Sequence, residues 1–131
     1  MYRFLLIMLF LIIPSLGVCE DIFTASIDPD GVQRVQIVGS EYQFKPGHII
    51  VKVDIPVELK LMKESWIIPH SFVLKVPDSD IDIDESLSNE PRIVRFTPRK
   101  TGRYPFYCNK KLLFFKSHRE KGMEGTIEVT E

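Results

Sequence analysis

The chain has 131 residues, with 17 lysines and arginines against 18 aspartates and glutamates, and a formal net charge of −1 at neutral pH. That length allows one ordinary domain and a short leader. Because binding to phosphate backbones needs a basic surplus, the charge balance argues against nucleic acid as a partner.

The N-terminus has the order of a secretory leader. One positive charge lies in residues 1–3, an unbroken apolar run covers 4–11, and small or helix-breaking residues follow before Glu20. We therefore expect residues 1–19 to be a signal peptide and the protein to be exported, to the periplasm or another extracytoplasmic compartment. A retained anchor stays open, although the run is shorter than the roughly 20 apolar residues of a membrane span. Lipidation at Cys19 stays open as well.

Beyond residue 32 the chain repeatedly alternates apolar and polar side chains with a period of two, which predicts half-buried strands. The alternating stretches fall at residues 35–38, 49–55, 57–61, 72–76, 94–96, 104–106 and 127–130. Proline and glycine separate them, and long helical periodicity is absent. We expect an all-β fold, an antiparallel Greek-key β-sandwich over residues 33–131, with residues 20–32 as an N-terminal extension.

Two stretches depart from this pattern. Residues 78–90 are strongly acidic, but their glycine and glutamate spacing does not fit a calcium loop, so we expect a solvated loop or an edge strand. Residues 109–117 hold four large apolar side chains, Leu112 to Phe115, between lysines. The pattern leaves open a short helix packed on the sandwich end or an exposed apolar patch.

Four metal-capable side chains stand at predicted strand ends. His70 begins one stretch and Cys108 ends another, each with the parity of the apolar residues beside it, while His118 and Met123 precede the last stretch. In an antiparallel sandwich the end of one strand and the starts of its neighbours meet at one pole, so these residues can converge. Taken singly, each also fits a structural role, since free cysteine and methionine often simply fill a core.

Two imidazoles, one thiolate and one thioether form the ligand set of blue-copper sites. Zinc would accept these ligands as well, and the methionine is the reason to favour copper. Cys108 is the single cysteine in this region, which excludes a dinuclear centre with two bridging thiolates. We interpret His48 as a surface residue without a role and expect Trp66 to pack near the site.

The flanks of these residues resemble the cupredoxin family over residues 33–131. The matching segments are Pro69 to Leu74 (PHSFVL), Thr101 to Cys108 (TGRYPFYC), the stretch from His118 to Val129 with its Gly-Met-x-Gly-x-Ile sequence, and Tyr42 to Gly47 (YQFKPG). The resemblance implies a cupredoxin-like sandwich that binds one mononuclear copper ion through His70, Cys108, His118 and Met123. Nine residues separate Cys108 from His118, which is more than in many small blue-copper proteins, although the copper nitrite reductase branch has a loop nearly as long.

The resemblance also implies a function, namely outer-sphere electron transfer between redox proteins such as a cytochrome or an oxidase-like partner. Four protein ligands leave no open coordination position, so we expect an electron carrier and not an enzyme. Two alternatives remain: a copper carrier or resistance protein without redox turnover, and a non-metal interaction domain. Residues 112–115 with Lys110, Lys111 and Lys116 are a candidate docking face. Membrane association is expected only through an uncleaved or lipidated N-terminus.

Overall fold

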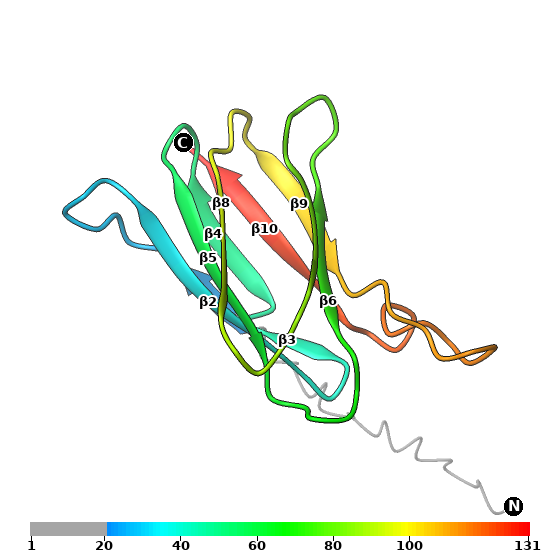
Figure 1. Ribbon diagram of the computed structural model, residues 1–131. Coiled ribbons are helices and arrows are strands. Elements are labelled where there is room, and N and C mark those ends of the chain that lie inside the picture. Colours follow the sequence, from blue (N-terminus) through cyan, green and yellow to red (C-terminus); the bar gives the residue numbers. More distant parts are fainter. Residues whose placement is uncertain (1–20) are drawn as a thin grey trace, which may run out of the picture.

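The computed structural model describes residues 21–131, which form two β-sheets packed face to face (Figure 1). Ten strands and no helix occur within these residues. Consistently, this part of the chain contains no helix long and apolar enough to cross a bilayer. The predicted signal peptide, residues 1–19, lies outside the described residues.

The larger sheet has six strands and the smaller sheet has four. In spatial order the larger sheet contains β1 (Ile22–Thr24), β4 (His48–Lys52), β10 (Glu124–Thr130), β9 (Gly102–Tyr107), β6 (Ser71–Lys75) and β7 (Asp82–Ser86). The smaller sheet contains β3 (Gln43–Lys45), β2 (Gln33–Ser40), β5 (Val57–Lys63) and β8 (Arg92–Phe96). The predicted β-sandwich is therefore confirmed.

The sheets are mixed and not purely antiparallel. β1 with β4, β4 with β10, and β2 with β5 run parallel, while the remaining pairs run antiparallel. Between β2 and β5 the chain crosses to the other sheet to form β4, and such a crossover returns it in the same direction. Alternation in the sequence fixes which face a residue occupies, but it carries no information on strand direction.

Part of the expected N-terminal extension belongs to the sandwich. β1 pairs along the edge of the larger sheet in register with His48 to Ile50. Ala25, directly after β1, is buried in the core and donates its amide to the Ile50 carbonyl at 2.9 Å. The described chain therefore contributes to the larger sheet almost from its first residue.

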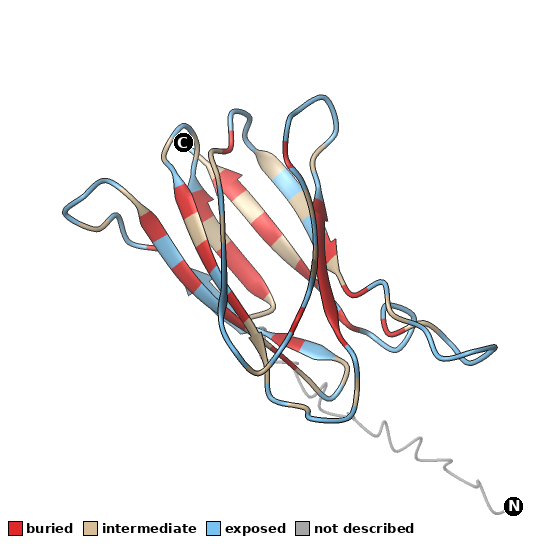
Figure 2. Cartoon of the chain, viewed as in Figure 1, coloured by how far each residue is buried: buried red, intermediate tan, exposed pale blue. Residues whose placement is uncertain are grey.

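Burial alternates along most strands, as Figure 2 shows by its red and paler bands. The inward side chains of β2, β5 and β10 are those that the sequence predicts, because a strand with one solvated face buries every second residue. β6 differs, since Ser71 to Leu74 are all buried. β7 forms an edge strand inside the acidic residues 78–90, which confirms one of the two readings of that segment.

Three phenylalanines pack together directly beneath the end of the sandwich where β6 begins and β9 ends. The ring centroid of Phe106 lies 5.1 Å from that of Phe72 and 5.2 Å from that of Phe44. Phe72 follows His70 by two residues, and Phe106 precedes Cys108 by two. Aromatic pairs at these separations add to the stability gained by burying their area. The cluster therefore gives both strand ends a rigid base.

Gly125 is required by the close approach of this cluster. It pairs with Phe106 across β10 and β9, and a Cβ at Gly125 would overlap the Phe106 ring and lie 2.6 Å from the Gly47 carbonyl oxygen. We predict that Gly125→Ala lowers the free energy of unfolding by roughly 2–3 kcal/mol, as overpacking does. Urea unfolding followed by circular dichroism measures it. Gly47→Ala is the control, because its Cβ would meet no atom closer than 3.6 Å; equal losses in both variants would contradict the prediction.

Candidate metal centre

The four predicted ligands lie at one end of the sandwich, in three different segments. His70 immediately precedes β6, Cys108 immediately follows β9, and His118 and Met123 belong to the segment that leads into β10. β6 and β9 are antiparallel neighbours, so the start of one meets the end of the other. All four side chains are buried, with exposed fractions of 4 % or less.

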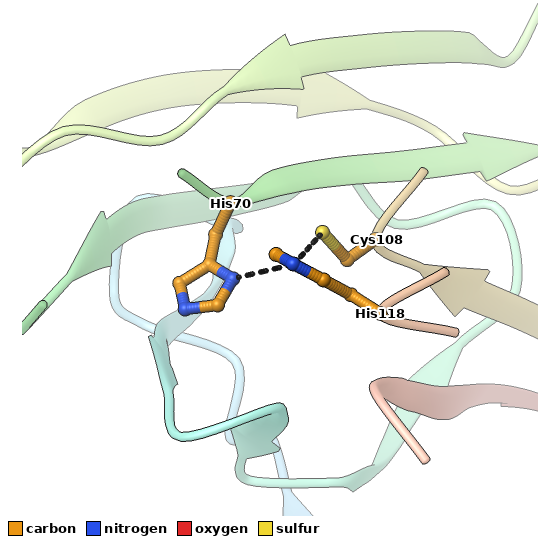
Figure 3. A group of neighbouring side chains, drawn as sticks. All are labelled: His70, Cys108 and His118. Atoms are coloured by element: carbon orange, nitrogen blue, oxygen red, sulfur yellow. Dashed lines mark hydrogen bonds between the residues drawn. The ribbon is translucent and has the colours of Figure 1, made fainter. Parts of the chain in front are cut away.

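His70, Cys108 and His118 come together as one cluster (Figure 3). The Nδ1 atoms of the two histidines are 3.3 Å apart, and Cys108 Sγ is 3.5 Å from His118 Nδ1. One nitrogen or sulfur atom from each residue lies within 4.8 Å of the other two. Two nitrogens bound at about 2.0–2.1 Å to one ion, with tetrahedral to trigonal angles, are roughly 3.3–3.6 Å apart. The spacing therefore fits a single mononuclear ion.

The environment favours the neutral form of both imidazoles, which is the form that binds metal. Burial lowers the pKa of His70 to about 4, and the neighbouring His118 and Lys63 act in the same direction. Protonated His70 would carry an N–H group on each ring nitrogen. One of these nitrogens, Nε2, is buried and has no hydrogen-bond partner within residues 21–131. Burial lowers the pKa of His118 as well, with a smaller contribution from Lys121.

Ser71 and Asn109 hold the thiol of Cys108 in place. The Ser71 amide donates to Cys108 Sγ at 3.3 Å. The Ser71 hydroxyl donates its one proton to Asn109 Oδ1 at 2.6 Å and accepts a hydrogen bond from the Asn109 backbone amide at 3.0 Å. Because that proton is used, the donor to Cys108 Sγ is the Ser71 backbone amide and not the Ser71 hydroxyl. Asn109 Nδ2 also lies 3.3 Å from the Asp84 carboxylate on β7. The sequence analysis missed both residues, although each directly follows a candidate ligand.

Backbone hydrogen bonds close the long segment between Cys108 and His118. The His118 amide donates to the Lys110 carbonyl at 2.9 Å, so residues 111–117 leave and return at nearly the same point. The Met123 amide then donates to the His118 carbonyl at 2.9 Å, and the Cys108 amide donates to the Met123 carbonyl at 3.1 Å. The nine intervening residues therefore form an outward excursion that does not displace His118 from the cluster.

Met123 is completely buried on the inner side of the same segment. Its methyl group packs against β2, where a Cβ at Gly39 would lie 3.1 Å from Met123 Cε. Gly39 thus leaves the room that the methionine side chain occupies. The role of the Met123 thioether as a ligand stays a prediction.

Tyr42 is a further contact of the cluster that the sequence did not reveal. Its ring meets the His118 ring edge-on at 4.9 Å, and Lys121 Nζ lies 4.4 Å from the centre of the Tyr42 ring. Glu41 and Tyr42 both have positive φ, 40° and 63°, in the turn between β2 and β3. Residues other than glycine rarely adopt this backbone conformation, which costs about 1–2 kcal/mol per residue. This unfavourable backbone conformation places the Tyr42 ring against the His118 ring.

Two expectations were wrong. His48 is buried and not a surface residue: it opens β4 between β1 and β10, and its Nε2 lies 2.8 Å from Glu128 Oε2. Trp66 does not pack near the site, because its side chain is 84 % exposed in the loop before β6.

Of the two readings of residues 112–115, the exposed patch is confirmed, since these side chains are 56–87 % exposed and form no helix.

The lowered pKa of His70 predicts how the stability of the metal-free protein depends on pH. The unfolded chain accepts a proton near pH 6.5, whereas folded His70 accepts it only near its pKa of about 4. The contribution of neutral His70 to the free energy of unfolding is therefore fully present above pH 6.5 and declines as the pH falls toward 4. We expect wild type to lose roughly 3 kcal/mol more unfolding free energy than His70→Gln between pH 7 and pH 4. Urea titrations at each pH measure this difference, and parallel pH profiles would refute it.

Solved structures with similar folds cover most of the described chain. No protein-family model and no curated protein matches the sequence. The metal-binding domain of the Streptococcus pneumoniae D39 Cu(I)-exporting P-type ATPase CopA is 24 % identical, with a TM-score of 0.61, over 88 % of this chain and 100 % of that one.

Two copper proteins have a similar fold. Auracyanin A from Chloroflexus aurantiacus is 19 % identical, with a TM-score of 0.59, over 76 % of this chain and 100 % of that one. Rusticyanin from Thiobacillus ferrooxidans is 20 % identical, with a TM-score of 0.58, over 87 % of this chain and 85 % of that one. The chain has the cupredoxin fold, with a buried His-Cys-His cluster at one end of its sandwich.

Proposed function

We propose that the protein is an exported electron carrier that holds one mononuclear copper ion with His70, Cys108 and His118, and with Met123 as a fourth, more distant ligand. The observation that carries the proposal is the approach of two imidazole nitrogens and one thiol sulfur to within 4.8 Å of one another in a buried site. This is the donor set of blue-copper centres, and a nearby thioether favours copper over zinc.

The protein's own groups support outer-sphere electron transfer. A bound copper ion would supply a one-electron couple between Cu(I) and Cu(II). The aromatic cluster beneath His70 and Cys108, together with the Ser71 contacts, fixes the donor atoms, so little rearrangement accompanies a change of charge. Met123 would complete the donor set as a fourth protein ligand, and a metal ion held by four protein ligands has no open position for a substrate. The proposed ligand set therefore supports a carrier and not an enzyme.

His118 is the ligand through which an electron would leave. It lines a surface pocket of about 290 Å³, together with Tyr42, Ile67 and Phe115. The other two members of the cluster do not line that pocket. We propose that a redox protein outside the cytoplasm, a cytochrome or an oxidase-like protein, approaches this end. Export itself is proposed from the leader pattern of residues 1–19.

The ligand assignment predicts an optical signature. Protein loaded with one equivalent of Cu(II) should show an intense visible absorption from sulfur-to-copper charge transfer, and Cys108→Ala should abolish it. Met123→Leu should keep the band and raise the reduction potential, because a thioether donor that would stabilise Cu(II) is lost. Met62→Leu, on β5, is the matched control and should change neither. Stoichiometric copper without a visible band would reject the assignment.

One observation favours a second candidate, a copper carrier without redox turnover. The similar domain from the Cu(I)-exporting ATPase is 24 % identical to this chain, against 19 % for auracyanin A and 20 % for rusticyanin. Voltammetry and transfer assays separate the two functions. An electron carrier gives a reversible one-electron couple and keeps its copper in the presence of a weaker Cu(I) chelator. A carrier of the metal gives no reversible couple and releases Cu(I) to the chelator.

A further inference from the structure

Six large apolar side chains protrude at the end of the sandwich that holds the metal centre, and we call them the apolar tip. They come from the loop before β6 and from the excursion before His118. Their exposed fractions are 84 % for Trp66, 92 % for Ile67, 65 % for Leu112, 73 % for Leu113, 87 % for Phe114 and 56 % for Phe115. The two loops meet, because Ile67, Leu112 and Phe115 line the same pocket. Figure 2 shows the excursion as a largely exposed projection.

Basic residues flank the part of the apolar tip that the excursion forms. Residues 109–123 carry five lysines and arginines against one acid, Glu120, although the whole chain has a net charge of −1. Glu120 accepts the Ser117 amide at 2.6 Å, and Arg119 pairs with Glu124 at 2.9 Å. Lys110, Lys111 and Lys116 flank the four apolar residues of the excursion directly. The excursion therefore presents protruding apolar groups between basic residues, whereas the loop that carries Trp66 and Ile67 has one acid, Glu64, and no basic residue over 64–69.

The N-terminal segment joins the sandwich at the same end. The Asp21 carbonyl accepts the His48 amide, and His48 pairs with Thr126, two residues into β10 from the metal end. The first described residue of the chain therefore lies at the same end of the sandwich as the metal centre.

We propose that the apolar tip docks on a bilayer that contains anionic lipid. Trp66 and the two phenylalanines would enter the interfacial region, where aromatic side chains are favoured, and the lysines would contact the lipid phosphates. Three of the six side chains, Trp66, Ile67 and Phe114, are 84–92 % exposed, so they stand clear of the sandwich and can enter the interfacial region without rearrangement. This inference does not depend on copper, since none of the six side chains belongs to the metal cluster.

Trp66 provides the test, because it is the single tryptophan of the chain and lies in the tip itself. The full chain, metal-free, is mixed with vesicles of phosphatidylcholine alone or with added phosphatidylglycerol. We expect a blue shift of Trp66 emission and quenching by brominated lipid only with the anionic vesicles. Binding through residues 1–20 alone would leave Trp66 emission unchanged.

Variants separate the two contributions. Lys110→Glu, Lys111→Glu and Lys116→Glu together should weaken the lipid-induced shift by more than about 100-fold in lipid concentration, because the loss of each lysine near an anionic surface removes about a fivefold factor and each new glutamate adds repulsion. Leu113→Ser with Phe114→Ser should abolish brominated-lipid quenching. The matched control is Lys60→Glu, Lys75→Glu and Lys100→Glu, which changes the net charge equally away from the tip and should behave like wild type.

Three results would overturn the proposal: no shift with anionic vesicles, equal loss in the control triple variant, or a shift with polyglutamate but not with vesicles. The last result would assign the tip to an acidic protein partner. Because the measurement uses metal-free protein, its outcome is independent of the copper absorption that tests the proposed function.

Discussion

The hydrogen bond from the His118 amide to the Lys110 carbonyl is the constraint on which the metal centre depends. It closes residues 111–117 into an excursion, so the length of the segment after Cys108 does not set the position of His118. The following bonds, from Met123 to His118 and from Cys108 to Met123, tie the same segment to the end of β9. The positions of the donor atoms therefore do not depend on the side chains of residues 111–117, which form an exposed surface of their own.

The rest of the structure stabilises this end. The phenylalanine cluster supports the two strand ends that present His70 and Cys108, and Gly125 allows that cluster to pack against β10. Ser71 connects the first of these strands to the second through sulfur and Asn109. Burial then holds both imidazoles in the neutral form. Rigid support and suppressed protonation are what a metal site needs in order to be ready before its ion arrives.

The sequence predicts the sandwich and the cluster for the same reason: a period of two identifies the buried face of each strand. Because His70 and Cys108 share that parity with the phenylalanines, their inward direction could be predicted. His48 could not be placed correctly, since its burial depends on parallel pairing with a strand 80 residues away. The contact of Tyr42 with His118 depends on a turn with two left-handed residues that are not glycine. Trp66 was predicted to pack near the site because it precedes His70 closely in sequence, but that proximity does not determine whether a loop side chain faces inward.

The metal centre and the apolar tip share one end of the molecule, so the surface beside His118 determines what can approach it. Two imidazoles and one thiolate are proposed to bind a single copper ion there. X-ray absorption at the copper edge of the singly loaded protein tests this coordination. We expect one short copper–sulfur contact and two imidazole nitrogens in the first coordination sphere. A spectrum with only nitrogen and oxygen neighbours, and no sulfur, would contradict it.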